Sequence, residues 1–215
     1  MIIKSIKGNK LGQTSYLLIK EDQAIVIDCG FDYSVLDEYV KEKNLKLSGV
    51  FLTHGHFDHS LSAHEFLKNR INVYSSEFSD KITTTGFDLG RFCGVKFTRF
   101  SSDIKLTDNA VVTLGEFTVH ALHTPGHTVD GMCYLIDGVL FSGDTLLSGG
   151  YGRIDLPTAS REDMITSLKR LLKFDKKMPV CSGHEKVQSG IQPFFPDRTI
   201  GDYNCSQDIM YLINS

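Results

Sequence analysis

Features that would mark several special classes of protein are scarce or missing in this chain. The five cysteines lie far apart and form no CxxC pair, which argues against a disulfide-stapled scaffold and against a cysteine-based zinc site. No apolar run approaches the ~20 residues of a membrane span. The first ten residues lack the apolar stretch of a signal peptide. We therefore expect a cytoplasmic protein without a membrane partner.

Neither sign of charge dominates the chain. It has 23 Lys and Arg residues against 26 Asp and Glu residues, a net charge of −3. This balance excludes the basic surface of a general nucleic-acid binder, so no nucleic-acid partner is expected. No internal repeat is present, which excludes a solenoid. With 215 residues, and at about 150 residues per domain, the chain is expected to form a single domain over 1–215.

Strand and helix signals alternate along the sequence. Ser34 and Ser160 are candidate N-caps of helices, and Asp137-Gly138 is typical of a tight hairpin turn. The clustering of strands in hairpins with helices between them, in two rounds, predicts an α/β fold: an αββα sandwich of two mixed β-sheets flanked by helices. The expected elements are strands over 17–19, 24–27, 49–53, 116–122, 132–136, 139–142 and 178–181, and helices over 34–43, 62–70 and 160–174, with one short helix early in 76–101.

The most informative segment follows the strand over 49–53 and contains four metal-binding side chains. His54 and His56 are two residues apart, so on an extended backbone they point the same way and can bind one ion. Asp58 and His59 come one turn later and are placed to face a second ion. Three histidines and an aspartate within six residues are improbable as a capping aspartate beside surface histidines.

Three further ligands stand alone at turns that follow strands. His127, Asp144 and His184 are each preceded by glycine, which lets the backbone turn sharply beside the side chain. Each one alone would be an ordinary turn residue. Together with the cluster they complete a set of five histidines and two aspartates, enough for two ions.

The motif HxHxDH followed by PGH, GD and GH, in this order, resembles the metallo-β-lactamase superfamily of hydrolases. The resemblance implies an αββα sandwich with two metal ions at the sheet edges. Asp144 argues against antibiotic hydrolysis, because the true β-lactamases lack a bridging carboxylate at this place. His56 argues against the diiron flavoprotein branch, which carries Glu there. The implied ligands are His54, His56 and His127 for the first ion, Asp58, His59 and His184 for the second, and Asp144 as the bridge.

Residues 143–146 and 150–157 (GDTL and GYGRIDLP) resemble the glyoxalase II-like (hydroxyacylglutathione hydrolase-like) group. Full-length glyoxalase II has a C-terminal helical domain that binds glutathione. Here 215 − 184 = 31 residues follow His184, so that domain is expected to be absent. The absence of this domain weakens the expectation of a glutathione thioester as the substrate. It does not weaken the expectation that the chain is a compact relative of glyoxalase II.

We therefore expect a dinuclear metal-dependent hydrolase that cleaves a small thioester, by attack of a hydroxide that bridges the two ions. Asp58 and Asp144 are the expected catalytic residues, which hold the hydroxide and take its proton. The expected cofactors are two divalent metal ions, zinc first, with iron or manganese as alternatives. The expected partner is a small-molecule substrate such as a glutathione thioester. A lactone hydrolase is the nearest alternative, and a mononuclear iron persulfide dioxygenase is the alternative of another class.

Two residues outside the ligand set are also candidates. Asp28 is expected to fix the tautomer of a ligand histidine, because zinc-binding histidines usually need such a partner. Arg153 either holds a substrate carboxylate, as in glyoxalase II, or pairs with Asp155 to fix the loop. The phenylalanines within 78–100 either line the mouth of the substrate pocket or pack as a local apolar cluster, and packing is the favoured interpretation.

Overall fold

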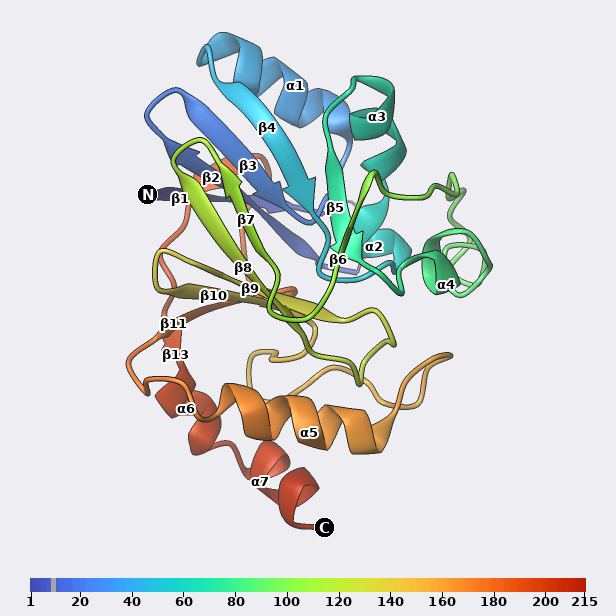
Figure 1. The fold of residues 1–215 in the computed structure, drawn as a ribbon, viewed down its shortest axis with the longest axis vertical. Helices are drawn as coiled ribbons and strands as arrows, with labels where there is room; N and C mark the ends of the chain where they lie inside the picture. Colours follow the sequence, from blue (N-terminus) through green and yellow to red (C-terminus); the bar gives the residue numbers. More distant parts are fainter. Residues whose placement is uncertain (9–10) are drawn as a thin grey trace.

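Two β-sheets lie face to face between two layers of helices in the computed structural model, which describes residues 1–8 and 11–215 (Figure 1). This arrangement confirms the expected αββα sandwich. Both sheets are mixed. In the first sheet the four strands β3 (Gln23–Ile27), β4 (Lys46–Phe51), β5 (Val73–Ser76) and β6 (Ile104–Leu106) run parallel, while the other neighbours are antiparallel. In the second sheet β10 (Val139–Gly143) and β11 (Pro179–Ser182) form the parallel pair.

The strand orders place early and late segments side by side. The first sheet has the order β12 (Ile191–Pro193), β1 (Ile2–Lys7), β2 (Thr14–Lys20), β3 (Gln23–Ile27), β4 (Lys46–Phe51), β5 (Val73–Ser76) and β6 (Ile104–Leu106). The second has the order β13 (Arg198–Thr199), β11 (Pro179–Ser182), β10 (Val139–Gly143), β9 (Met132–Ile136), β8 (Phe117–His123) and β7 (Val111–Leu114).

The helices fall into two groups on opposite outer faces (Figure 1). The upper layer contains α1 (Tyr33–Glu42), α2 (Phe57–Ser60), α3 (Ala63–Lys68) and α4 (Asp80–Thr83). The lower layer contains α5 (Arg161–Leu171), α6 (Ile200–Asn204) and α7 (Gln207–Asn214).

Side-chain alternation along the strands explains the three apolar cores. In β2, Leu18 packs between the two sheets, while Leu17 and Ile19 pack toward the helices of the upper layer. In β3, Ile25 likewise packs between the two sheets, and Val26 packs toward the upper helices. Strands that are buried on both faces read as continuous apolar runs, which is why these segments were recognisable in the sequence. The third core lies between the second sheet and α5 to α7.

Local signals were read correctly at some element ends and wrongly at others. Ser160 does cap α5, accepting a hydrogen bond from the Asp163 amide. The expected cap at Ser34 is wrong: α1 begins at Tyr33, and the Asp32 carboxylate caps it by accepting from the Ser34 amide. At an N-cap, Asp accepts a hydrogen bond from the helix as well as Ser does, so residue type alone could not distinguish Asp32 from Ser34.

The expected helix over 62–70 is shorter, and β4 begins three residues before the expected strand. The Asp137-Gly138 hairpin between β9 and β10 is confirmed, with both residues at positive φ. The sequence did not indicate β1, β5, β6, β7, β12, β13, α6 or α7.

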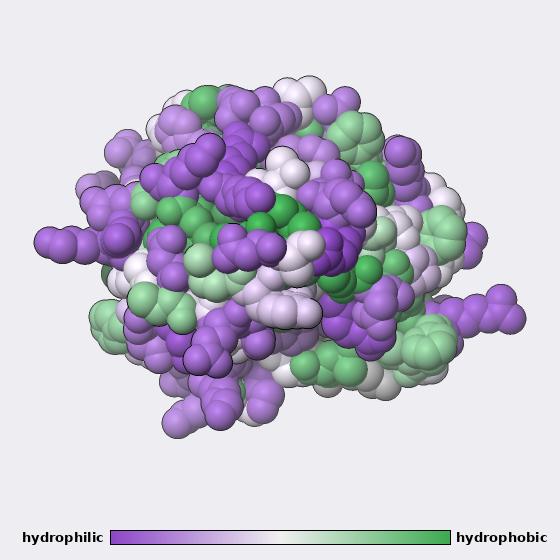
Figure 2. Space-filling model, turned by 90° about the horizontal axis from the view of Figure 1, so that it is seen from below, coloured by the Kyte–Doolittle hydropathy of each residue, from purple (hydrophilic) through white to green (hydrophobic). Residues whose placement is uncertain are grey.

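The face formed by the lower helix layer is mostly hydrophilic. Figure 2 views the molecule from this side and shows hydrophilic side chains over most of the surface, with apolar ones in small separate groups. Among the described residues, no helix has the length and apolar character needed to cross a membrane.

Candidate metal centre

All seven expected ligands are at the carboxyl ends of strands that meet at one edge of the sandwich. His54 to His59 follow β4 and run into α2, and His127 lies in the loop between β8 and β9. Asp144 follows β10, and His184 follows β11 after Gly183. Because β10 and β11 are parallel, their carboxyl ends lie together. The Met132 amide donates to the Thr53 carbonyl at 2.7 Å and thereby joins the two sheets at this edge.

Three imidazoles converge at one end of the site. His56 Nδ1 lies 3.1 Å from His54 Nε2 and 3.1 Å from His127 Nε2. All three side chains are buried. Three ring nitrogens that face one another so closely repel unless a cation or a proton lies between them.

A second group converges beside the first. His59 Nε2 lies 3.5 Å from His184 Nε2 and 3.9 Å from Asp58 Oδ2, and His184 Nε2 lies 3.7 Å from the same Asp58 oxygen. His59 is fully buried, while the His184 side chain is 25% exposed.

The Asp144 carboxylate lies between the two groups. Its Oδ1 lies 3.3 Å from His59 Nε2, and its Oδ2 lies 3.3 Å from His184 Nε2 and 3.6 Å from His127 Nε2. One carboxylate oxygen thus faces a nitrogen from each group.

These separations fit metal coordination. Ligand atoms bound tetrahedrally to an ion at about 2.0–2.1 Å are roughly 3.3–3.4 Å apart. The donor pairs at 3.1–3.9 Å scatter around that value. Imidazole and carboxylate are donors that zinc, iron and manganese all accept. The described residues can therefore hold two adjacent divalent ions, and this donor set does not distinguish among those metals.

Hydrogen bonds behind the imidazoles fix which nitrogen faces the site. Asp28 Oδ2 accepts from His59 Nδ1 at 2.8 Å and from the Thr53 hydroxyl at 2.8 Å, while Asp28 Oδ1 accepts from the Thr53 amide at 2.7 Å. Because the Thr53 hydroxyl donates to Asp28, its oxygen can accept from His54 Nδ1 at 3.2 Å. One buried carboxylate therefore orients a histidine in each group.

Backbone carbonyls do the same for two other histidines. His127 Nδ1 donates to the Arg153 carbonyl at 2.8 Å, and His184 Nδ1 donates to the Leu11 carbonyl at 3.2 Å. The sequence carries no side-chain signal for these carbonyl partners. Thr53 was also missed, although its place directly before the histidine cluster was the available signal.

Burial and neighbouring charges set the protonation states. Burial lowers the pKa of His54 and His56 well below the usual histidine value, so both are neutral and offer lone pairs. Burial also opposes the charged form of His59, but Asp144 and then Asp28 outweigh it and raise the pKa of His59 well above its usual value. Burial opposes ionisation of Asp144, yet His59 and His184 together outweigh it and hold the Asp144 pKa well below its usual range. The carboxylates thus require positive charge beside them, from protons or from metal ions.

Two glycines make this close packing possible. A Cβ at Gly183 would overlap Asp144 Oδ1 and come within 2.7 Å of His59 Cε1. Gly143 has a φ of +50°, and a Cβ there would overlap the Thr53 side chain. Side chains at either position would displace the ligands that the turns carry.

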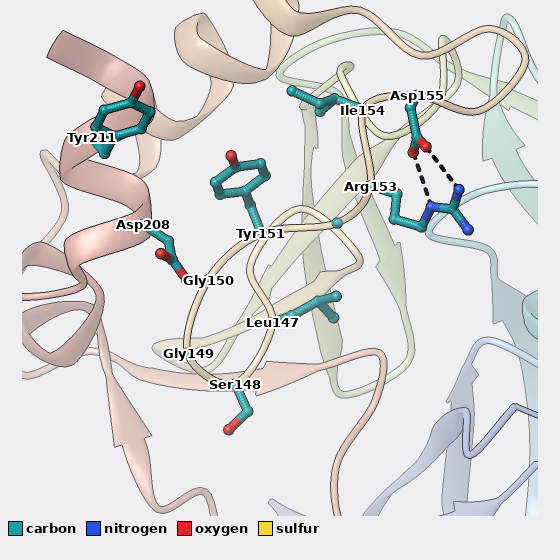
Figure 3. A pocket seen from close by; sticks show the side chains of 11 residues that line it. Leu147, Ser148, Gly149, Gly150, Tyr151, Arg153, Ile154, Asp155, Asp208 and Tyr211 are labelled. Carbon is teal, nitrogen blue, oxygen red and sulfur yellow. Dashed lines mark hydrogen bonds and ion pairs between the residues drawn. The ribbon is translucent and has the colours of Figure 1, made fainter. Parts of the chain in front are cut away.

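The Arg153 side chain is paired with a neighbour on its own loop. Figure 3 shows its guanidinium facing Asp155, with Nε and Nη2 donating to the two carboxylate oxygens at 2.9 and 2.8 Å. Of the two roles expected for Arg153, the structure therefore displays the pairing. Both side chains are about two-thirds exposed, and exposed pairs of this kind contribute little stability.

A cavity of about 680 Å³ opens onto the ligands. Its lining includes His56, Asp58, His127, Asp144 and His184, and Arg153 lies on its wall. The phenylalanines of the segment 78–100 divide between their two expected roles: Phe92 lines this cavity, while Phe100 is buried in the core beneath the upper helices, with Phe97 packed against it.

Comparison with known proteins agrees with this geometry. The family model of the metallo-beta-lactamase superfamily matches residues 8–184. The probable metallo-hydrolase YqgX of Bacillus subtilis (strain 168) is 32% identical over 178 residues, which are 79% of this chain and 83% of that protein. A hydroxyacylglutathione hydrolase of Citrobacter koseri is 35% identical over 179 residues, 80% of this chain, but only 62% of that protein's length is spanned.

Among solved structures, the BLEG-1 B3 metallo-beta-lactamase superposes with a TM-score of 0.81 at 27% identity, covering 95% of this chain and 98% of that one.

Proposed function

Because the chain belongs to the metallo-beta-lactamase superfamily, whose members bind divalent metals, we propose that it is a dinuclear hydrolase of small thioesters. The observation that carries this proposal is the position of Asp144 between two convergent ligand groups. His54, His56 and His127 would hold one ion, Asp58, His59 and His184 the other, and Asp144 would contact both.

When bound, two such ions supply an activated water near neutral pH and polarise the substrate carbonyl. Asp58 and Asp144 both face His184 Nε2, and either carboxylate could accept the proton of such a water. Burial raises the pKa of Asp58, which makes this carboxylate the better proton acceptor of the two. Asp28 keeps the imidazole of His59 turned so that Nε2 faces the site.

The leaving group favours a thioester over an amide. A thiol of pKa ~8.5 departs as thiolate without a general acid, whereas an amine needs one. Among the described residues that line the cavity, Cys93 and Arg153 are the polar side chains outside the ligand set. The Arg153 guanidinium keeps its proton and Cys93 is exposed to solvent, so neither is a buried general acid. A lactone would meet the same site and is tested in parallel.

The deciding experiment measures the metal content of the purified protein together with turnover of a glutathione thioester, a lactone, a β-lactam and glutathione persulfide. We expect two divalent ions per chain, zinc first, and hydrolysis of the thioester in the absence of oxygen. One bound iron, with oxygen-dependent consumption of the persulfide and an intact thioester, would overturn the proposal in favour of the dioxygenase. Preferred turnover of the β-lactam or the lactone would overturn the thioester assignment alone.

Arg153 provides a test of how the substrate is held. We propose that its guanidinium exchanges Asp155 for a carboxylate on the substrate, since both partners are exposed and the pair is weak. Arg153→Met should then raise KM for a carboxylate-bearing thioester and leave KM for a neutral analogue unchanged. Equal losses on both substrates, together with a lower melting temperature, would instead mean that the residue only braces its loop.

A further inference from the structure

Apart from the ligands, the lining of the metal-centre cavity is mostly apolar, and we call this part the apolar wall. Seven aliphatic or aromatic residues form it, and they come from four segments that are distant in sequence. They are Leu11 after β1, Phe57 at the start of α2, Leu89 and Phe92 after α4, and Leu147, Leu156 and Pro157 after β10.

Two of these side chains are exposed to solvent although they are large and apolar. Phe92 is 89% exposed and Leu11 is 63% exposed. Solvent exposure of a single apolar residue is ordinary. Here, however, exposed apolar groups line the same cavity as the metal ligands, where a substrate must be bound.

The backbone provides a second, independent observation. Leu11 and Leu89 have φ values of +58° and +65°, in the left-handed region. This conformation is unfavourable for a leucine, and most of the other described residues with positive φ are Asn, Asp or glycine, which tolerate it better. Both leucines line the same cavity, and backbone strain is characteristically retained at binding sites.

We propose that this wall binds the acyl group of the substrate, and that the substrates are thioesters of apolar acyl chains several carbons long in place of short hydroxyacyl groups. The inference rests on the proposed thioester hydrolysis. The carbonyl would lie at the ligands, the acyl chain would lie along Leu89, Phe92 and Leu156, and the thiol would leave toward solvent. Burial of each additional methylene would strengthen binding until the wall is covered.

The test is a series of thioesters of one neutral thiol, N-acetylcysteamine, with acetyl, butyryl, hexanoyl and lactoyl groups, assayed on the metal-loaded protein. We expect kcat/KM to rise about fourfold for each methylene that becomes buried, and lactoyl to rank below butyryl. A flat series, or one led by lactoyl, would overturn the inference and leave thioester hydrolysis intact. Absence of turnover on every member would instead refute the proposed function.

Two variants and a matched control test whether the acyl chain binds at this wall. Phe92→Ala should lower the hexanoyl-to-acetyl ratio of kcat/KM by about tenfold, whereas Phe195→Ala, at an equally exposed phenylalanine outside the cavity, should leave the ratio unchanged. Leu89→Asn should also lower the ratio while the melting temperature stays the same or rises, because Asn tolerates left-handed backbone. Equal ratios in all three proteins would contradict the assignment.

Cysteine labelling gives a readout that does not depend on turnover. Cys93 lines the cavity, and Cys205 is an exposed thiol outside it. Hexanoate, the expected product, should slow alkylation of Cys93 by iodoacetamide and leave Cys205 unaffected, while lactate at the same concentration protects neither. Unchanged labelling of Cys93 in saturating hexanoate would overturn the placement of the acyl chain.

Discussion

The substitution Asp28→Asn tests how much one buried carboxylate contributes to metal binding by both ligand groups. The carboxylate accepts three hydrogen bonds, from the Thr53 amide, the Thr53 hydroxyl and His59 Nδ1. Asn keeps the size of the side chain and tolerates the φ of +58° at this position. The substitution replaces one acceptor oxygen by an NH₂ donor, so it changes hydrogen bonding with little change of shape.

The consequence follows from donor and acceptor geometry. If the new amide oxygen stays with the Thr53 amide, its NH₂ faces His59 Nδ1 and the Thr53 hydroxyl. His59 relieves the donor–donor contact by moving its proton to Nε2, the atom that faces Asp58 and Asp144. The Thr53 hydroxyl turns to accept from the NH₂ and donates to His54 Nδ1, which places the proton of His54 on Nε2 as well.

A proton on Nε2 must be removed before that nitrogen can bind a metal. Loss of an outer hydrogen-bonding partner typically weakens metal binding about 10–100-fold, which corresponds to about 1.4–2.7 kcal/mol. Two hydrogen bonds to a buried carboxylate, each worth about 1.5–3 kcal/mol, are replaced by bonds to a neutral amide, each worth about 0.5–1.5 kcal/mol, so the upper part of that range is expected. The weakening should affect both ions, because one tautomer changes in each group.

The measurement is a competition titration of each ion against a chromophoric chelator. The histidine tautomers are read from ¹⁵N chemical shifts of the metal-free protein at a pH above the raised pKa of His59, where its ring carries a single proton. Asp22→Asn serves as the control, since it removes the same charge from an exposed carboxylate that pairs with Lys46. Unchanged affinities in Asp28→Asn, or retention of the proton on Nδ1 of His59, would refute this account of how the histidines are oriented.

Three further predictions concern the bridge, the turn beside it and a buried acid behind the site. Asp144→Ala should lower the metal stoichiometry measured by elemental analysis and reduce turnover by at least ~100-fold, because it removes the carboxylate that faces both groups. A variant that retains two tightly bound ions and full activity would contradict the bridging role. Gly183→Ala should also lose metal, since its Cβ would overlap Asp144, whereas Gly150→Ala, which meets nothing closer than 3.8 Å, should bind metal normally. Burial raises the pKa of Asp130 to about 7, so the folded state keeps a proton that the unfolded chain releases above pH ~4. This contribution to stability is complete below pH ~4 and is lost as the pH rises to 7, by up to about 4 kcal/mol. In denaturant unfolding at pH 4, 5.5 and 7, Asp130→Asn should therefore gain stability relative to the parent as the pH rises, and a constant difference would show that Asp130 ionises normally.

The sequence by itself determined the ligand types and the places where they could lie. Metal binding needs particular donor atoms, and glycine-preceded turns after strands are local features, so His54 to His59, His127, Asp144 and His184 could be recognised along the chain. The order of these motifs also indicated the family, and with it the αββα fold. Central strands such as β2 and β3 were visible because they are buried on both faces and therefore read as apolar runs.

Only the tertiary structure decided which atoms face one another. The link from Asp28 through Thr53 to His54 crosses from β3 to β4, and the carbonyls of Leu11 and Arg153 orient histidines that are 173 and 26 residues away. Carbonyls are present at every residue, so no sequence pattern distinguishes the ones that are used. The edge strands β6 and β12 were missed for a related reason, because three residues carry too little periodicity and their pairing partners are distant in the chain. The apolar wall likewise exists only because folding brings the segments around Leu11, Leu89 and Leu156 to the same cavity.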